Sequence, residues 1–511
     1  MKKNVMRMLT LVLAVVLLAG LVSGCGKDSG NNGTTGGAAV NTGAATQPAG
    51  TTGTEEKVKV SILVPSDFES HIRQALEVFS ESHPNIEVKL IIGAEEASKM
   101  PSELSTLAAG NKLPDVAIGV ENFAYILSQG LAYPLDNLYA ADPDKEDALQ
   151  AGINNYTYNG HLYALPFRVQ FNGIMVNLDL IETKNLDEPD YDWTIEEFID
   201  MAKKATDNQY SGINIVESSD STHTLQTKLM GAMMNAPYNM YGYNMDTHEF
   251  DFTSGPWTKS QEYITELRSV PGLISDELKE WDKRNKGIPD AYDNKFGGSA
   301  DAMVAGKVLF GNHNSWETYW MVKKCNFEWD LYPVPHAEDV AERIQTHVDY
   351  AFLTPAVTEQ NAQAAYEVIK FLSYSKEGCL TRLAITDEGV SANDYTAFYT
   401  PGSSNPDVLE AYFDNDLIPE GMKYMLETIS EDPEKIFIAD ANKLIPNFWN
   451  DVDDYLSQTE EQIKNGGDAH ALAQDLQNKV NAAAKDTWER FEKKLEKNLE
   501  EFYKTHPYEK K

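Results

Sequence analysis

The sequence predicts an α/β fold in which parallel strands alternate with helices. β-Branched runs at residues 58–65, 86–92 and 113–118 are separated by segments whose apolar residues recur every three or four positions. Strand, helix and strand in that order form βαβ units, whose right-handed crossovers make consecutive strands parallel. The chain is 511 residues long and 42% hydrophobic, which is enough for two domains with separate cores.

Charge and cysteine content exclude several classes of protein. Asp and Glu number 79 against 43 Lys and Arg, which gives a formal net charge of −36. Such a surface repels a phosphate backbone, so we exclude nucleic acid as the main partner. The three cysteines, Cys25, Cys325 and Cys379, are too few for a disulfide scaffold and are not spaced as paired zinc ligands. Cys325 and Cys379 could be bonded or could be two separate thiols.

The first 24 residues have the plan of a secretory signal, with basic residues followed by an apolar run over residues 8–22. That run is shorter than the roughly 20 apolar residues of a comfortable membrane span. It ends in small residues before Cys25, a sequence that resembles a lipobox, in which the thiol receives a diacylglycerol after cleavage. We predict a lipoprotein signal peptide at 1–24 and lipidation of Cys25. An ordinary signal peptide is the alternative.

Residues 25–56 are rich in Gly, Thr, Ala and Asn and carry almost no large apolar side chain, so they cannot form a core. We interpret them as a flexible tether between the lipid and the folded body. Gly26 after the cysteine and the length of the tether resemble Gram-positive lipoproteins. This resemblance implies a lipid-anchored protein on the extracellular face of the cell membrane.

Amphipathic patterns locate the helices of the body. Residues 66–69 and 194–197 predict capping boxes, each followed by apolar residues at helical spacing, and residues 365–372 carry a similar stripe. No second Gly-rich linker divides the body, so two lobes would have to share strands. Beyond about residue 468 we expect a charged helix with one narrow packing face, made of Trp488, Phe491, Leu495 and Phe502.

A series of short segments follows the first strand, helix and strand in a fixed order. The segments are LPD at 113–115, GLAYPLD at 130–136, YNGHLYALP at 158–166, MVN at 175–177, WTIEE at 193–197, AMVAGK at 302–307, NSW at 314–316 and DLYPVP at 330–335. In this order they resemble the extracellular solute-binding proteins of ABC transporters, in the branch that contains maltodextrin-binding and other oligosaccharide-binding proteins. The resemblance spans residues 58–484.

The resemblance implies a two-lobe periplasmic-binding-protein-like fold of type II, with parallel-rich sheets flanked by helices and hinge strands between the lobes. It implies strand crossings near residues 167–174 and 332–336 and a third after Thr354. The expected lobes are residues 57–168 with 336–358, and residues 169–335 with 359–511.

The resemblance also implies a function. Contacts from both lobes would stabilise a closed state around a solute, and a transporter would read that closed shape. We therefore expect a receptor for a carbohydrate, in particular an oligosaccharide, that delivers its solute to the permease subunits of an ABC importer. We expect a monomer without a cofactor.

Candidate ligand-binding residues follow the strands, because ligands in such folds meet loops at the carboxyl ends of strands. Asp67 and Phe68 follow the first strand, and Glu121 and Asn122 follow the third. Helix capping is the alternative role of Asp67. Gln170 lies in the expected hinge, where the maltodextrin-binding branch carries a Glu, so the identity of the ligand cannot be transferred.

Aromatic side chains are the second group of candidates, because the C–H-rich face of a sugar ring packs on an aromatic ring. Trp316 follows a polar loop, and Trp449 resembles a late aromatic residue of the family. Tyr241 lies in a tyrosine-rich segment, residues 235–243. For each of them a place in the core is the alternative.

Arg168 lies in the expected hinge of a very acidic chain. Its guanidinium could pair with the carboxylate of a uronate-type sugar. An internal salt bridge to one of the many Asp and Glu side chains is the alternative.

Other functions lack a pattern in the sequence. The histidines are scattered without metal-ligand spacing, and no catalytic signature such as a nucleophile elbow or a P-loop occurs, so we expect neither a metal site nor an enzyme. A secreted carbohydrate-active enzyme remains an alternative, because two carboxylates at a suitable separation would not be visible in the sequence. A peptide or another small solute is the alternative cargo.

Overall fold

The computed structural model describes residues 57–510, except 95–96, 120–121, 215–223, 276–290, 299–300 and 390–398. The chain divides into Met1–Thr54 and one compact unit, Glu55–Lys511. The predicted signal peptide, the tether, the lipidation site Cys25 and the candidate Glu121 lie outside the described residues. Among the residues that are described, no helix is both long enough and apolar enough to cross a membrane.

The first sheet has the strand order β15-β14-β3-β1-β2, with β6 also pairing with β14. β1 runs parallel to β2 and β3, as the βαβ pattern predicts. β14 runs antiparallel to β3 and β6 and parallel to β15, so the first sheet is parallel-rich but not wholly parallel. The strands of the first sheet are β1 (Val58–Val64), β2 (Ile86–Ile92), β3 (Val116–Gly119), β6 (Leu165–Phe171), β14 (Ile344–Leu353) and β15 (Ile436–Ile438).

The second sheet has the order β13-β7-β12-β8. β7 is antiparallel to both of its neighbours, and only β12 and β8 run parallel. The second sheet is therefore less parallel than expected. Its strands are β7 (Gly173–Asn177), β8 (Ser211–Asn214), β12 (Val308–Gly311) and β13 (Trp329–Pro333); the short strands elsewhere are β4 (Thr157–Tyr158), β5 (His161–Leu162), β9 (Tyr238–Asn239), β10 (Tyr243–Asn244) and β11 (Glu249–Phe250).

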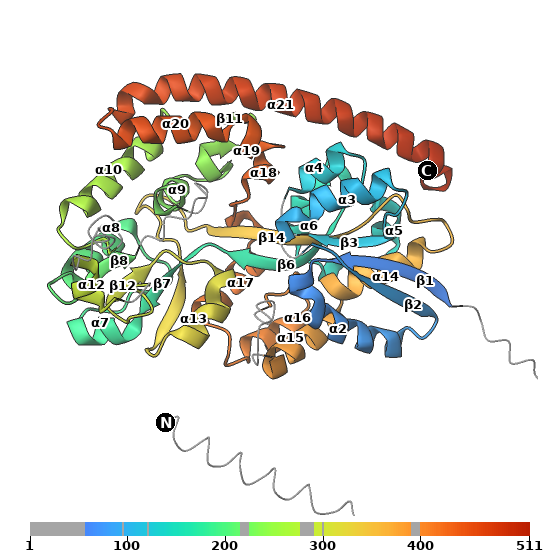
Figure 1. Ribbon diagram of the computed structural model, residues 1–511, viewed down its shortest axis with the longest axis horizontal. Coiled ribbons are helices and arrows are strands. Elements are labelled where there is room, and N and C mark those ends of the chain that lie inside the picture. Colours follow the sequence, from blue (N-terminus) through green and yellow to red (C-terminus); the bar gives the residue numbers. More distant parts are fainter. Residues whose placement is uncertain are drawn as a thin grey trace, which may run out of the picture. The chain divides into compact units, whose positions relative to one another are not determined.

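Helices surround both sheets, and Figure 1 shows how they are placed. The helices are α2 (Glu69–Ser82), α3 (Met100–Ala109), α4 (Phe123–Ser128), α5 (Asp136–Ala141), α6 (Gln150–Asn155), α7 (Leu178–Lys184), α8 (Ile195–Ala205), α9 (Leu225–Gly231), α10 (Pro256–Ser269), α12 (Ala291–Phe296), α13 (Thr318–Lys324), α14 (Ala362–Ser373), α15 (Lys376–Gly389), α16 (Pro406–Phe413), α17 (Glu420–Glu431), α18 (Ala441–Leu444), α19 (Phe448–Asp451), α20 (Asp453–Lys464) and α21 (Ala469–Thr505).

The two capping boxes are predicted at the starts of α2 and α8. At α8 the box is confirmed, because the Thr194 hydroxyl accepts from the Glu197 N–H and the Glu197 carboxylate accepts from the Thr194 N–H. The box predicted at residues 66–69 is wrong. A 3₁₀ turn, η1 (Ser66–Phe68), precedes α2 instead, and Phe68 occupies the N-cap position without a capping side chain.

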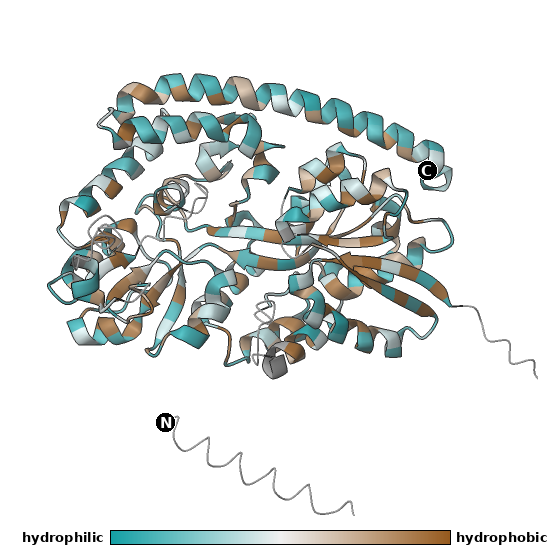
Figure 2. Ribbon diagram, in the orientation of Figure 1, coloured by the Kyte–Doolittle hydropathy of each residue, from teal (hydrophilic) through white to brown (hydrophobic). Residues whose placement is uncertain are grey.

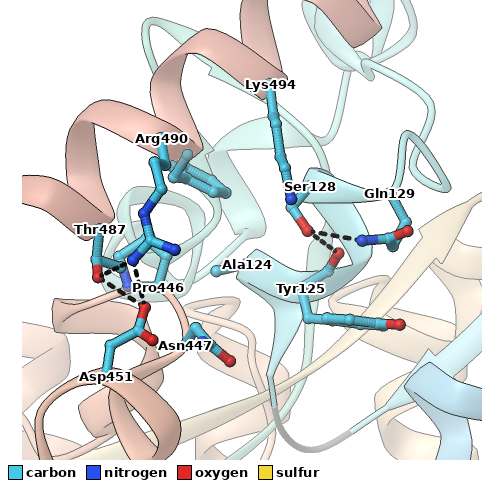
Figure 3. A pocket seen from close by; sticks show the side chains of 11 residues that line it. Ala124, Tyr125, Ser128, Gln129, Pro446, Asn447, Asp451, Thr487, Arg490 and Lys494 are labelled. Carbon is cyan, nitrogen blue, oxygen red and sulfur yellow. Dashed lines mark hydrogen bonds and ion pairs between the residues drawn. The ribbon is translucent and has the colours of Figure 1, made fainter.

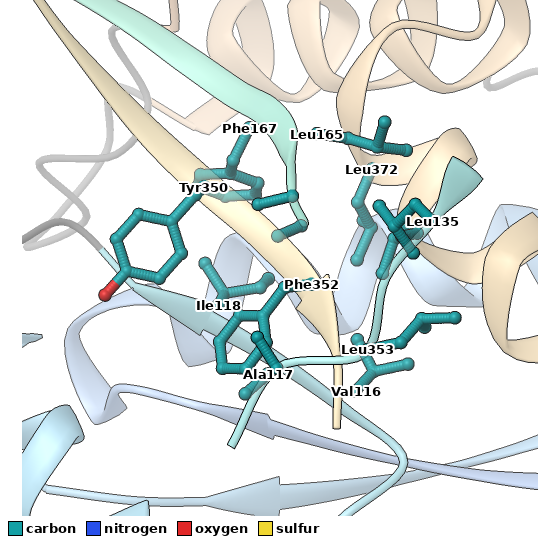
Figure 4. Packing of buried hydrophobic residues seen from close by; sticks show 14 of the residues in the cluster. Val116, Ala117, Ile118, Leu135, Leu165, Phe167, Tyr350, Phe352, Leu353 and Leu372 are labelled. Carbon is teal, nitrogen blue, oxygen red and sulfur yellow. The ribbon is translucent and has the colours of Figure 1, made fainter. Parts of the chain in front are cut away.

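The first hydrophobic core lies around the first sheet (Figure 4). Strand β3 and residues 350–353 of β14 contribute a continuous buried set to this core because both of their faces are covered. Leu372 of α14 packs in this core, and α15 contacts α2. Helix α14, which the expected lobe limits place in the second lobe, thus packs with the first sheet, whereas in α15 Ile385 lies in the first core and Cys379 and Leu383 lie in the cluster that contains α16 and α17. Local patterns show that a helix is amphipathic but not which of two cores receives it.

Helix α21 packs in two cores. Leu476 and Val480, in its first half, lie in a cluster with the β9–β11 segment and α18–α20. Phe491, Leu495 and Phe502, in its second half, lie in the first core. These residues form one stripe, so the predicted narrow packing face is confirmed, and the rest of the helix is largely hydrophilic (Figure 2).

Polar contacts fix both halves of α21. In the first half, Asn481 accepts from the backbone N–H of Phe250 at 2.7 Å and donates to its carbonyl oxygen at 3.1 Å, as a neighbouring strand would. In the second half, the Asn498 amide donates to the Leu127 and Ser128 carbonyl oxygens at 2.9 and 3.1 Å. The helix thereby connects the β9–β11 segment to α4.

The two cysteines of the folded unit are both free thiols. Cys379 is buried and Cys325 is half-buried. Of the two alternatives left open by the sequence, the structure shows separate thiols.

We predict that Leu495→Ala lowers the free energy of unfolding by about 2 to 5 kcal/mol, because it leaves a cavity where α21 meets the first core. Urea unfolding measures this change. Lys497→Ala, an exposed position on the same helix, is the control and should change stability by less than about 0.5 kcal/mol. Equal effects of the two substitutions would show that α21 does not pack as described.

Candidate functional site

The polypeptide passes between the two sheets where β6 joins β7. β6 ends at Phe171 in the first sheet and β7 begins at Gly173 in the second, so only Asn172 separates them. This position agrees with the crossing predicted at residues 167–174. β6 and β14 lie side by side between the two sheets (Figure 1).

Two further crossings are predicted, one near residues 332–336 and one after Thr354. His336 still donates its backbone N–H to the Trp193 carbonyl oxygen, at 3.1 Å, so the chain leaves the second sheet after residues 332–336. β14 then begins at Ile344. Beyond Thr354 the chain packs in the first core along α14, and in α15 Cys379 and Leu383 already lie in the cluster that contains α16 and α17.

A buried polar cluster surrounds the first crossing. Lys228 Nζ of α9 donates to the Gly173 carbonyl oxygen at 3.0 Å and to Asn314 Oδ1 at 2.7 Å. It also donates to the His313 carbonyl oxygen at 3.2 Å. The Gln345 side chain donates to the Lys228 carbonyl oxygen at 2.8 Å and accepts from Asn172 Nδ2 at 3.2 Å. We call this cluster the hinge junction: Asn172, Gly173, Lys228, Asn314 and Gln345.

Lys228 is the charged member of the hinge junction, and 1% of its surface is exposed. Burial removes water from the ammonium and lowers the pKa of Lys228 from its ordinary value of 10.5 to about 7, while the charge of Glu317 opposes this shift. Three acceptor oxygens replace the lost water. The lysine therefore holds together the crossing and the loop that precedes Trp316.

Gln170 and Trp316 lie next to the hinge junction. Gln170 Oε1 accepts from the Ser315 hydroxyl at 2.5 Å, and that hydroxyl accepts from the Phe171 N–H at 2.8 Å. His347 pairs opposite Gln170 on β14, and its ring meets the half-buried Trp316 ring at 5.3 Å in a T-shaped arrangement. The buried Gln170 Nε2 has no hydrogen-bond partner among the described residues, so the donor remains for a ligand or a water.

Arg168 makes an internal ion pair. Its Nε donates to Asp349 Oδ2 directly across the β6–β14 pair, and the guanidinium lies 4.9 Å from the centre of the Phe68 ring. Both charged side chains are 6% exposed. Burial raises the pKa of Asp349, and the nearby Arg168 charge opposes that shift. The internal salt bridge, one of the two alternatives for Arg168, is therefore the one observed.

Phe68 belongs to the same cluster. It is fully buried and stacks on Phe167 with ring centres 5.8 Å apart. Its neighbour Asp67 is half-buried at the carboxyl end of β1, in the position expected for a residue that faces a ligand.

Sequence reasoning missed Arg382 of α15, which is fully buried. Its Nη1 donates to the Phe167 carbonyl oxygen at 2.7 Å, and its guanidinium lies 3.7 Å from the Tyr399 ring centre. Its Nε donates to His71, and burial lowers the pKa of that histidine. The local sequence around Arg382 contains no sign of this role, because the partners are 215 and 311 residues away in the sequence.

Asn122 caps the start of α4 with a left-handed backbone (φ 56°, ψ 40°). Asn adopts this conformation more readily than most residues. Its buried Oδ1 has no hydrogen-bond partner among the described residues. Like Gln170, it offers a polar atom that the described protein does not use.

The remaining two aromatic candidates lie together on Phe448. Tyr241 stacks on Phe448 with ring centres 5.4 Å apart, and Trp449 meets the same ring edge-on at 5.3 Å. Tyr241 is 2% exposed, whereas Trp449 is half-buried. Tyr238 is also half-buried and Tyr243 is buried, so most of this tyrosine-rich segment serves the core.

The structure thus groups the candidates in two places. Phe68, Arg168, Gln170 and Trp316 lie along the crossing strands, and Tyr241 and Trp449 lie against Phe448 of α19. Within the described part of the chain, no three His, Cys, Asp or Glu side chains are arranged to hold a metal ion. The crossing offers amide donors, acceptors and an aromatic ring, which suit the binding of a polar solute.

Comparison with known proteins identifies the family. The family model for bacterial extracellular solute-binding proteins matches residues 61–377, more than half of the chain. The chain belongs to this family. It is an extracellular solute-binding protein rather than an enzyme. No curated protein sequence matches the chain at a significant level.

Solved structures show the same two-lobe fold. An ABC substrate-binding protein of Listeria monocytogenes in complex with cycloalternan has 17% identity and a TM-score of 0.59, covering 84% of this chain and 99% of that one. The cyclic α-maltosyl-1,6-maltose binding protein of Arthrobacter globiformis has 15% identity and a TM-score of 0.58, covering 84% and 100%. The sugar-binding protein MalE of Xanthomonas citri has 14% identity and a TM-score of 0.59, covering 85% and 99%.

We predict that Asp349→Ala lowers the free energy of unfolding by about 3 to 5 kcal/mol, because Arg168 is left as a buried charge without its partner. Asp407→Ala, which breaks the exposed pair with Lys376, is the control and should cost at most about 1 kcal/mol. Urea unfolding of both variants measures the difference. If Asp349→Ala lowers the free energy of unfolding by less than about 1 kcal/mol, the Arg168–Asp349 pair is not desolvated.

We predict that the stability of the protein relative to its Lys228→Met variant increases as the pH rises from about 7 towards 10.5. Between these pKa values the unfolded lysine holds a proton that the folded lysine has released, so raising the pH favours folding. Below about pH 7 both states are protonated and the difference is constant. Urea unfolding of both proteins at pH 6, 8 and 9.5 tests this, and Lys443, whose pKa is also lowered to about 7, cancels because both proteins contain it. A difference that does not change with pH would contradict the shift.

Proposed function

We propose that the protein is a lipid-anchored receptor on the extracellular face of the cell membrane that captures an oligosaccharide and delivers it to an ABC importer. The lipid anchor at Cys25 and the tether rest on the sequence pattern. The carbohydrate class is supported by the solved structures that share the fold, several of which are named as sugar-binding or were solved with a saccharide. Delivery to an importer is supported by the family.

The observation that carries the carbohydrate assignment is the setting of Trp316. Its half-buried ring sits directly after Asn314 and Ser315 and beside Gln170, whose Nε2 remains a free donor in the described protein. An aromatic face next to amide and hydroxyl groups matches a sugar ring, which has an apolar face and hydroxyls around its edge.

The hinge provides the mechanism of capture in this proposal. A solute that touches both lobes favours the closed state by its difference in affinity between closed and open forms. Within the described residues, β6–β7, the segment from β13 to β14 and the helix α21 are among the connections between the two parts of the protein. The lobe limits are also part of the proposal: the first lobe takes 57–168, 344–389 and the end of α21, and the second lobe takes the rest.

We predict that a neutral oligosaccharide stabilises the protein and that Trp316→Leu weakens its binding about tenfold or more. A ligand present at a hundred times its dissociation constant adds about 2.7 kcal/mol of stability, which a thermal-shift screen detects. Trp320→Leu is the matched control, because Trp320 is 46% exposed on the next helix. Stabilisation by a peptide but by no saccharide would overturn the carbohydrate class. Equal loss in both tryptophan variants would remove Trp316 from the site.

A further inference from the structure

A cavity of about 190 Å³ lies between α4, the start of α19 and α21 (Figure 3). Tyr125 and Ser128 of α4 and the following Gln129 line it on one side, and Asn447, which directly precedes α19, lines it on the other. Binding pockets for whole ligands are about 300 to 1,000 Å³. The cavity therefore suits one sugar unit or its substituent rather than an entire oligosaccharide.

The cavity adjoins two of the candidate ligand loops. α4 begins directly after Asn122, and α19 contains Trp449 two residues after Asn447. The walls of the cavity come from two hydrophobic clusters, because α4 packs in the first core and α19 packs in the cluster around Phe448. A ligand in the cavity would contact both sides at once, as a ligand that stabilises closure must.

The charge of the cavity is opposite to that of the chain. Arg490 and Lys494 of α21 line it, with Asp451 as the single acidic side chain in the lining. The chain as a whole has a net charge of −36. Two cations on the solvated face of a helix would be ordinary. Here, however, Arg490 and Lys494 line the same cavity as the end of α4.

Arg490 is held in position by neighbouring groups. Its Nη2 donates to Asp451 Oδ2 at 2.9 Å and to the Thr487 hydroxyl at 3.0 Å. Its Nε makes an ion pair with Asp486 Oδ2 at 3.0 Å. Its Nη1 has no hydrogen-bond partner in the described part of the chain. A guanidinium that is fixed on one side and has free N–H groups on the other is arranged to donate hydrogen bonds to a carboxylate.

Lys494 lies one turn further along α21. Its side chain extends towards Ser128 on the opposite wall (Figure 3). It is exposed, and no ion pair or hydrogen bond of its ammonium occurs within the described ranges. Two cations from one helix therefore face the hydroxyl and amide groups of α4.

We propose that this cavity binds the negatively charged substituent of an acidic oligosaccharide, with Arg490 and Lys494 contacting the carboxylate or sulfate. Ser128, Gln129 and Tyr125 contact the hydroxyls and the ring that carry the charged group. The inference rests on the proposed function, because it assigns a substrate class to that receptor. Arg168 is not available for this role, because its side chain is only 6% exposed and pairs with Asp349, whereas the Arg490 side chain is 56% exposed.

The test is calorimetric titration of the folded protein with matched acidic and neutral saccharides, glucuronate against glucose and trigalacturonate against galactotriose, at 20 and 200 mM salt. We expect the acidic member of at least one pair to bind about threefold to tenfold more tightly, and the excess affinity to shrink at high salt. Lys494→Gln should remove most of that excess. Arg490→Lys, which keeps the charge but not the planar fork, should reduce it as well.

Lys493→Gln is the matched control, because Lys493 is exposed on the same turn, outside the cavity lining, and is paired loosely with Glu489 at 3.9 Å. It should leave both affinities unchanged.

Two outcomes would overturn this inference and leave the proposed function in place. One is binding of neutral saccharides with no preference for acidic ones, and the other is an acidic preference that survives in Lys494→Gln. If inorganic sulfate binds in a way that depends on Lys494, and acidic saccharides are not preferred, the cavity binds a free anion and the proposal of a saccharide substituent is wrong. Absence of binding by every saccharide would overturn both proposals.

Discussion

The backbone crossing between β6 and β7 is the constraint on which the rest of the structure depends. At Asn172 and Gly173 the chain leaves one sheet for the other inside the protein, so the backbone groups there cannot rely on a continuous ladder or on water. The hinge junction supplies the missing partners, and the Lys228 ammonium alone holds three oxygens. The loop that carries Trp316 is fixed by the same contacts, which places the strongest aromatic candidate beside the hinge.

Helix α21 adds a connection that the crossing strands do not supply. Its first half packs with the β9–β11 segment and its second half with α4 and the first core, so any change in the angle between the lobes must be accommodated along one continuous helix. Closure about the strands and packing of α21 are therefore coupled. The cavity beneath Arg490 and Lys494 lies where this helix, α4 and α19 meet, so an occupant would affect that coupling.

The polar residues of the hinge separate into two groups by what they already contact. Arg168 and Asp349 pair with each other, and Arg382 donates to buried carbonyl groups and packs on aromatic rings, so these charges maintain the fold. Gln170 and Asn122 each keep a buried polar atom without a partner among the described residues. An unsatisfied buried polar atom costs free energy, and binding a hydroxyl-rich solute would recover it. By this measure Gln170 and Asn122 remain binding candidates, whereas Arg168, which is paired with Asp349, is a structural residue.

The sequence by itself determined the features that depend on neighbours within a few residues. The βαβ order, the capping box of α8 and the packing stripe of α21 all follow from local periodicity, and the order of family segments indicated the two-lobe fold. Only the tertiary structure decided that β14 is antiparallel, that α14 packs with the first core and that Arg168 pairs with Asp349, 181 residues away. Burial and pairing of this kind depend on which distant segments meet in space, and a local pattern of apolar and charged residues is compatible with several such meetings.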